Sequence, residues 1–185
     1  MDIEEILNLG TYPIDDSGTP GGQALIDRCR ADLRKNLYCS IPDFVSPQAL
    51  AFMAEEVTGL KAEAYHNHSL RNCYLHQSKD TALPQDHALN LQDRSSVRMI
   101  AYDQLIEASP LKTFYQSKIV QELVAGIVGE GPLYPNIDAY QPANYVYYEN
   151  GDESSWHFDS DNSFTMTLMI QPAAHGGIFQ MSANT

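Results

Sequence analysis

The stretch GDESSWHFDSDNSFTMTLMIQ, residues 151–171, joins a histidine and an aspartate to an alternating run. The alternation predicts a strand, with one face carrying Phe164, Met166, Leu168 and Ile170. His157 and Asp159 stand at its expected start. Because residues i and i+2 of a strand point to the same face, we expect this imidazole and this carboxylate to aim at one point.

Two interpretations of this His-x-Asp pair are open from the residues alone. With another histidine, one nitrogen and one oxygen ligand form the facial triad of non-heme iron(II) oxygenases. The ordinary alternative is a strand end with two solvated side chains, because the motif by itself is a weak signal. Trp156, the single tryptophan, is expected to be a core aromatic.

The sequence upstream is mainly helical in its periodicity. Helices are predicted over residues 22–37, 47–59, 99–107 and 110–128. Ser46 and Ser109 are the expected N-caps, each followed by proline, and Gly129 is the expected stop. Residues 38–41, YCSI, are a candidate short strand, and residues 175–181, HGGIFQM, predict a turn and another strand. Helices first and an antiparallel sheet second make an α+β order.

Residues 61–98 have no lasting period and predict a long irregular loop. The loop contains His66, His68, His76 and His87, which we expect mostly at the surface. The pair in His66-Asn67-His68 is the hardest of these to set aside, since a loop of this length is able to fold over a site.

The pattern NYVYYENGDESSWHFDSDNSFTMTLMIQ…GGIFQ resembles the core of Fe(II)/2-oxoglutarate-dependent dioxygenases. It is most similar to small bacterial amino-acid hydroxylases and the related halogenases. The upstream stretches IPDFVSPQALAFMAEEV and YDQLIEASPLKTFYQSKIVQELVAGIVGEGPLY resemble their helical part. The resemblance covers residues 38–181. It implies one domain over 1–185, with a mainly helical part at 1–132 and the first strands of a double-stranded β-helix (jelly roll) at 133–185.

The resemblance also implies a site. His157 matches the first iron ligand and Asp159 the carboxylate ligand, with Fe(II) as metal and 2-oxoglutarate as cosubstrate. Tyr148 matches a position against 2-oxoglutarate, and Asn144 would line the same pocket. In halogenating relatives a small residue replaces the carboxylate and halide takes its place, so Asp159 favours hydroxylation. The expected substrate is small and polar, such as a free amino acid.

Two elements of that pattern are missing from the sequence. His175, at a predicted turn, is the only histidine after His157, and no lysine or arginine follows Lys118 to pair with 2-oxoglutarate. The cations left for that role are Arg71, Arg94 and Arg98. We expect the chain to be the N-terminal part of a longer enzyme. There are two alternatives. Another chain supplies the missing histidine and cation, or the protein is a degenerate jelly-roll protein that binds without catalysis.

The charge and cysteine content of the sequence limit the kinds of binding partner and the cellular compartment that we expect. A net charge of -13 argues against nucleic acid and against anionic membranes. Three cysteines without a CxxC pattern indicate reduced thiols in a cytoplasmic protein, and no basic-then-apolar leader occurs. The acidic residues near the site, Glu149, Asp152, Glu153 and Asp161, are expected to be a solvated rim, although they would also suit an ammonium group. The sequence leaves open whether the protein forms a homo-oligomer.

Overall fold

The computed structural model describes residues 1–14, 18–159 and 164–182. The chain forms two compact units. The first contains residues 1–59, 101–144 and 178–185, and the second contains residues 60–100 and 145–177. None of the helices in the described ranges is long and apolar enough to span a membrane.

The first unit is helical. Its elements are α1 (Ile3–Ile6), α2 (Pro20–Asn36), α3 (Pro47–Leu60), the 3-10 turn η3 (Tyr102–Gln104), α4 (Pro110–Gln116) and α5 (Lys118–Val128). The helices predicted over 22–37 and 47–59 are confirmed. The block predicted over 110–128 is also helical, but it breaks into two helices at Ser117, whose ψ of 123° is extended.

The helix ends follow local hydrogen bonding. The Ala49 amide donates to Ser46 Oγ at 3.2 Å, which confirms Ser46 as a cap. Gly129 ends α5 with a φ of 79°, a left-handed value that glycine adopts without steric cost. Ser109 stands at the N-cap of α4 but does not cap it through its side chain, because its hydroxyl donates to Glu56 Oε2 at 2.6 Å.

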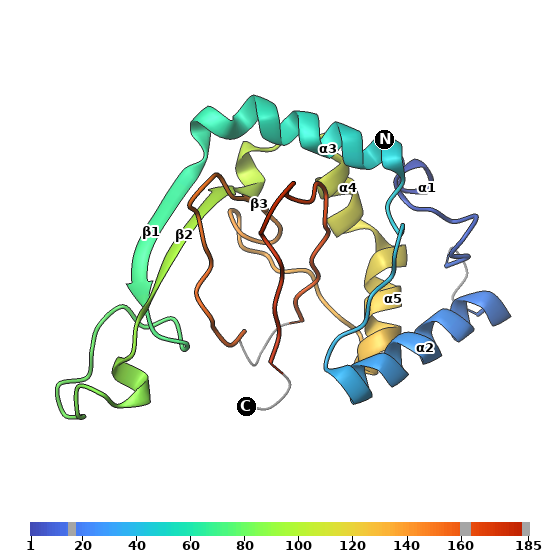
Figure 1. Cartoon of the computed structure of the whole chain (residues 1–185). Helices are drawn as coiled ribbons and strands as arrows, with labels where there is room; N and C mark the ends of the chain where they lie inside the picture. Colours follow the sequence, from blue (N-terminus) through green and yellow to red (C-terminus); the bar gives the residue numbers. More distant parts are fainter. Residues whose placement is uncertain (15–17, 160–163, 183–185) are drawn as a thin grey trace. The chain divides into compact units, whose positions relative to one another are not determined.

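Close packing of α2 against α5 is the main helical contact of this unit (Figure 1). A side chain at Gly126 would place its Cβ 2.9 Å from Ile26 Cδ1, so the glycine allows the approach. Arg30 of α2 donates through Nε to the Gly126 carbonyl at 2.5 Å. The Gly126 carbonyl is in the last turn of α5, where carbonyl groups have no partner within the helix, and the bond from Arg30 supplies one.

The second unit contains the sheet. Its strands are β1 (Tyr65–Arg71), β2 (Asp93–Ile100) and β3 (Tyr145–Tyr147), with the 3-10 turns η1 (Lys61–Glu63) and η2 (Ala88–Asn90). The order is β1-β2-β3, and both pairings are antiparallel. Helices together with an antiparallel sheet confirm the α+β class.

Several local predictions are wrong. The segment 61–98 is not an irregular loop, since it contains β1 and most of β2, and residues 99–107 are not a helix. Two strands therefore precede α4, and the order of helices first and sheet second does not hold. Residues 38–41, 164–170 and 178–181 are not strands. In the described part of the chain, residues 164–170 and 178–181 have no neighbouring strand with which to form backbone hydrogen bonds.

Buried asparagines organise the loop between β1 and β2. Asn72 is 2% exposed; its side-chain oxygen accepts from the Tyr74 and His76 amides, and its Nδ2 donates to the Leu89 carbonyl. Asn90 is 3% exposed and donates to the Asp80 and Pro84 carbonyls. These side-chain bonds to the backbone organise the segment, which contributes no buried apolar side chain to the core.

The packing of α2 gives a stability prediction. Ile26 is 5% exposed, whereas Ile106 of the same unit is 56% exposed. Ile26→Ala should lower the free energy of unfolding by about 2–5 kcal/mol, and Ile106→Ala by less than about 0.5 kcal/mol, in urea denaturation followed by circular dichroism. Equal losses for the two variants would contradict this packing.

Candidate functional site

The segment that carries His157 is anchored to the end of β1 and to the loop after it. The Phe158 amide donates to the Cys73 carbonyl at 2.9 Å. The centroid of the Phe158 ring lies 5.2 Å from the centroid of the Tyr74 ring. Ser155, 6% exposed, accepts from Arg71 Nε at 2.9 Å through its hydroxyl. Residues on both sides of His157 are therefore fixed to one end of the sheet.

His157 and Asp159 are brought together. His157 Nδ1 lies 2.8 Å from the Ser155 carbonyl oxygen, which can only accept, so Nδ1 carries the proton. Nε2 lies 3.6 Å from Asp159 Oδ1. The two residues lie in coil rather than on a strand, and both are exposed. The side chains nevertheless converge on one side of the segment.

The structure places the other residues that the sequence analysis named at separate positions. Asn144 immediately precedes β3 and is half-buried, and Tyr148 immediately follows it and is exposed. Trp156 is 52% exposed, so its predicted core position is wrong. His175 is exposed next to Gly176, whose φ of 71° fits the predicted turn. Asp161 lies outside the described residues.

A second group of potential ligands lies on the sheet. His66 and His68 point to the same side of β1, with ring centroids 4.4 Å apart, and Asp152 joins them from the turn after β3. One ligand atom of each residue lies within 4.8 Å of the others. Sequence reasoning missed this group because β1 was not predicted: in a strand, His-x-His places both rings on one face.

Asp152 is the most highly connected side chain of this group. Its Oδ1 accepts from the Ser96 hydroxyl at 2.5 Å, and its Oδ2 accepts from the Glu149 amide at 2.9 Å and from Arg98 Nε at 3.0 Å. These donors, the hydroxyl foremost, hold the pKa of Asp152 well below its usual range. Its side chain is 6% exposed, so the prediction of a solvated rim is wrong for Asp152.

The three arginines of the second unit differ in their partners. Arg94 pairs with Glu153 at 2.8 Å, and Arg98 pairs with Glu149 at 3.2 Å as well as with Asp152. Arg71 is half-buried and donates to two hydroxyls, Ser155 Oγ and, at 2.8 Å, Ser95 Oγ.

No carboxylate within residues 1–14, 18–159 and 164–182 approaches the Arg71 guanidinium within salt-bridge distance. This includes Asp93, its cross-strand neighbour. Within the described part of the chain, the partners of the Arg71 guanidinium are therefore neutral.

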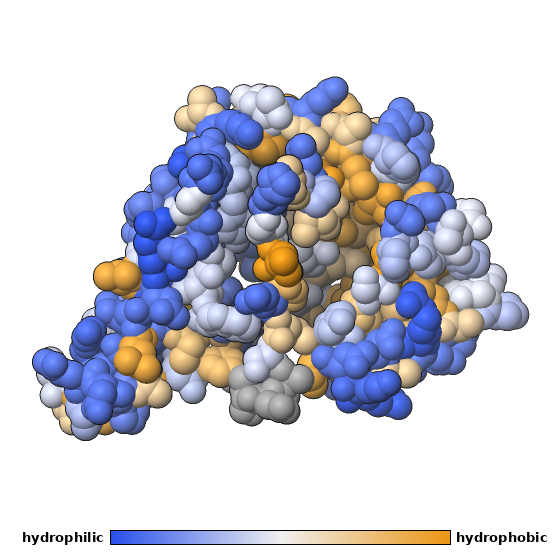
Figure 2. Space-filling model, viewed as in Figure 1, coloured by the Kyte–Doolittle hydropathy of each residue, from blue (hydrophilic) through white to orange (hydrophobic). Residues whose placement is uncertain are grey.

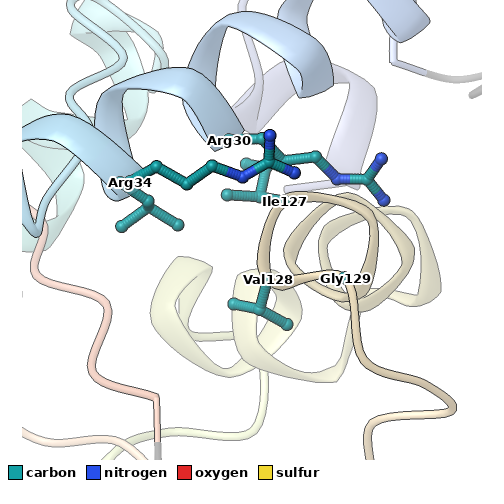
Figure 3. Close-up of a pocket in the computed structure, with 6 residues that line it drawn as sticks. Arg30, Arg34, Ile127, Val128 and Gly129 are labelled. Carbon is teal, nitrogen blue, oxygen red and sulfur yellow. The ribbon is translucent and has the colours of Figure 1, made fainter.

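Two other places do not provide a metal site. A hollow in the first unit is lined by Arg30, Leu33 and Arg34 of α2 and by residues 127–129 at the end of α5 (Figure 3). These residues include no histidine, cysteine or carboxylate. Burial raises the pKa of the Cys29 thiol to about 11, which disfavours the thiolate needed for ligation or attack.

Comparison with curated proteins and with solved structures finds no match. A family model described as halogenase D matches residues 22–185, which include both strands of the β1–β2 pair, the His157–Asp159 pair and the helices α4 and α5. The match covers most of the chain, and this chain belongs to the halogenase D family.

Proposed function

We propose that this chain is an Fe(II)- and 2-oxoglutarate-dependent oxygenase that hydroxylates a small, polar, amino-acid-like substrate in the cytoplasm. The observation that carries the proposal is the His157–Asp159 pair, 3.6 Å between Nε2 and Oδ1, in a halogenase D family chain. The proposal includes a jelly-roll core to which the three-stranded sheet belongs.

The donor set fits iron. An imidazole and a carboxylate are two members of the facial triad of non-heme iron enzymes. Two atoms that are each ~2.1 Å from one ion lie at most ~4.2 Å apart, and the Nε2–Oδ1 distance is within that limit. Ser155 supports the pair by fixing the protonated nitrogen away from it. Bound iron together with 2-oxoglutarate would supply the oxidising chemistry toward an unactivated C–H bond.

Asp159 favours hydroxylation over halogenation. A carboxylate bound to the metal occupies the position that a halide would need. Halogenation is the second candidate, and the family match favours it. The two reactions differ at this one position, so the product distinguishes them.

Arg71 is the residue we assign to the carboxylate of the cosubstrate. Its guanidinium donates to the neutral hydroxyls of Ser95 and Ser155, both buried, and among the described residues it pairs with no acid. Hydroxyls hold the planar guanidinium in place without neutralising it, so a bidentate carboxylate can still bind. Ser155 also accepts from His157, so the cation and the metal ligand share one support.

The central test is turnover. With Fe(II), 2-oxoglutarate, chloride and a panel of amino acids, the protein should form succinate and a product heavier by one oxygen atom in mass spectrometry. His157→Ala should abolish turnover because it removes a metal ligand, while His76→Ala, in the exposed loop, should leave it unchanged.

Each other outcome has a distinct meaning. A product with chlorine in place of hydrogen would select halogenation. Binding of 2-oxoglutarate without any turnover would select the binding protein that does not catalyse. Turnover that survives His157→Ala would remove the pair from the mechanism.

Arg71 has its own test. Arg71→Ala should raise the 2-oxoglutarate concentration at half-maximal succinate formation about 10- to 150-fold, because one charge-assisted bond contributes about 1.5–3 kcal/mol. Arg71→Lys should recover only part of the loss, since lysine lacks the bidentate fork. Arg94→Ala breaks an exposed pair and is the matched control. Equal shifts for Arg71→Ala and Arg94→Ala would contradict the assignment.

A further inference from the structure

We propose that His66, His68 and Asp152 form a second metal site, of the class that binds Zn²⁺ or Co²⁺, which ties β1 to the turn before His157. The proposal is independent of the oxygenase assignment. It uses none of the ligands of the His157–Asp159 pair.

The backbone places the three ligands. His66 and His68 are two residues apart on β1, so both rings stand on one face of the strand. Asp152 closes a turn in which its amide donates to the Glu149 carbonyl at 2.9 Å. Gly151 occupies the third position of that turn with a φ of 89°, a conformation that favours glycine. The turn thereby carries the carboxylate back to the sheet.

The ligand atoms are almost in position. His66 Nε2 already lies 3.4 Å from Asp152 Oδ1. The largest separation within the group is at most 4.8 Å, close to the ~4.2 Å limit for two atoms that share one ion. The exposed ring of His68 can make up the difference by rotation of its side chain. Two imidazoles and one carboxylate leave a fourth position of a tetrahedral ion for water.

Outer partners orient the carboxylate. Arg98 and the Glu149 amide both donate to Oδ2, which leaves Oδ1 directed toward His66. Hydrogen bonds of this kind to the distal oxygen of a ligating carboxylate are the usual support of metal sites. Because Arg98 also pairs with Glu149, and Arg94 with Glu153, the negative charge of Asp152 is not cancelled within the cluster.

Ser96 completes the cluster in the form without metal. Its hydroxyl donates to Asp152 Oδ1, so its oxygen is left to accept from His66 Nε2 at 2.8 Å. A neutral hydroxyl is a weaker ligand than imidazole or carboxylate, so a metal ion can replace it between the two when the Nε2 proton of His66 moves to Nδ1 or is released to water. The hydrogen-bonded chain from His66 through Ser96 to Asp152 marks the place that the ion would occupy.

The site faces solvent on one side. Figure 2 shows hydrophilic side chains over the visible face of β1 and β2. His68 is exposed and the Asp152 side chain is buried, so an ion can enter from water on the His68 side.

The test is metal binding to the whole chain with the other pair removed. The double variant His157→Ala, Asp159→Ala should still bind one Zn²⁺ by calorimetry and should develop the visible absorption of a four-coordinate Co²⁺ complex. Adding His68→Ala should weaken binding by more than ~100-fold, beyond the effect of losing an outer-shell partner. His76→Ala is the matched control.

His68 is chosen because its ring is exposed and its loss should not unfold the sheet. Circular dichroism of each variant checks this. Unchanged affinity in the His68→Ala background, or no bound ion in the double variant, would overturn the proposal. Asp152→Asn gives a second measurement: it should abolish the Co²⁺ spectrum at the same protein concentration.

Discussion

The Asp152 carboxylate joins the sheet to the segment that carries His157. It accepts from the Ser96 hydroxyl on β2, from Arg98 on the same strand and from the Glu149 amide. Next to it, Ser96 and Glu153 exchange two backbone hydrogen bonds of 2.7 and 3.1 Å. Without the carboxylate, buried donors would lose their partner at a cost of about 1–3 kcal/mol each, and the path of residues 149–155 would lose its anchor.

Buried polar residues, in addition to the apolar Val97, Ile100 and Tyr145, determine how this sheet is built. β2 buries Ser95 and Ser96 completely, and each hydroxyl is bonded to a charged or ionisable group from a neighbouring segment. A buried hydroxyl tolerates only the geometry that satisfies it, so these bonds fix the placement of the side chains around them. The same bonds orient Arg71 and His66, the residues of the two proposed binding sites.

The difference between the two units explains what the sequence could predict. The sequence predicts α2, α3 and the block that contains α4 and α5 within a few residues, because they rest on apolar periodicity, caps and the Gly129 stop, which are local signals. It does not predict the short α1 or the break at Ser117. β1 and β2 were missed because YHNHSLR and the first part of DRSSVRMI have no apolar alternation, and these strands are bonded to partners distant in sequence. The His157–Asp159 pair could be proposed because its spacing is local, whereas the His66–Asp152 contact spans 86 residues and depends on the unpredicted strand.

Ser155 links the two functions that the proposed reaction needs. Its carbonyl accepts from the His157 ring and its hydroxyl accepts from the Arg71 guanidinium, so one residue contacts both the proposed metal ligand and the proposed anion-binding group. A cosubstrate that bridges metal and arginine requires that these two points keep a constant separation. Because Ser155 is buried and follows the turn anchored by Asp152, the separation is set by the sheet. The polar sheet, and not the exposed His-x-Asp segment itself, would therefore determine how precisely such a cosubstrate is held.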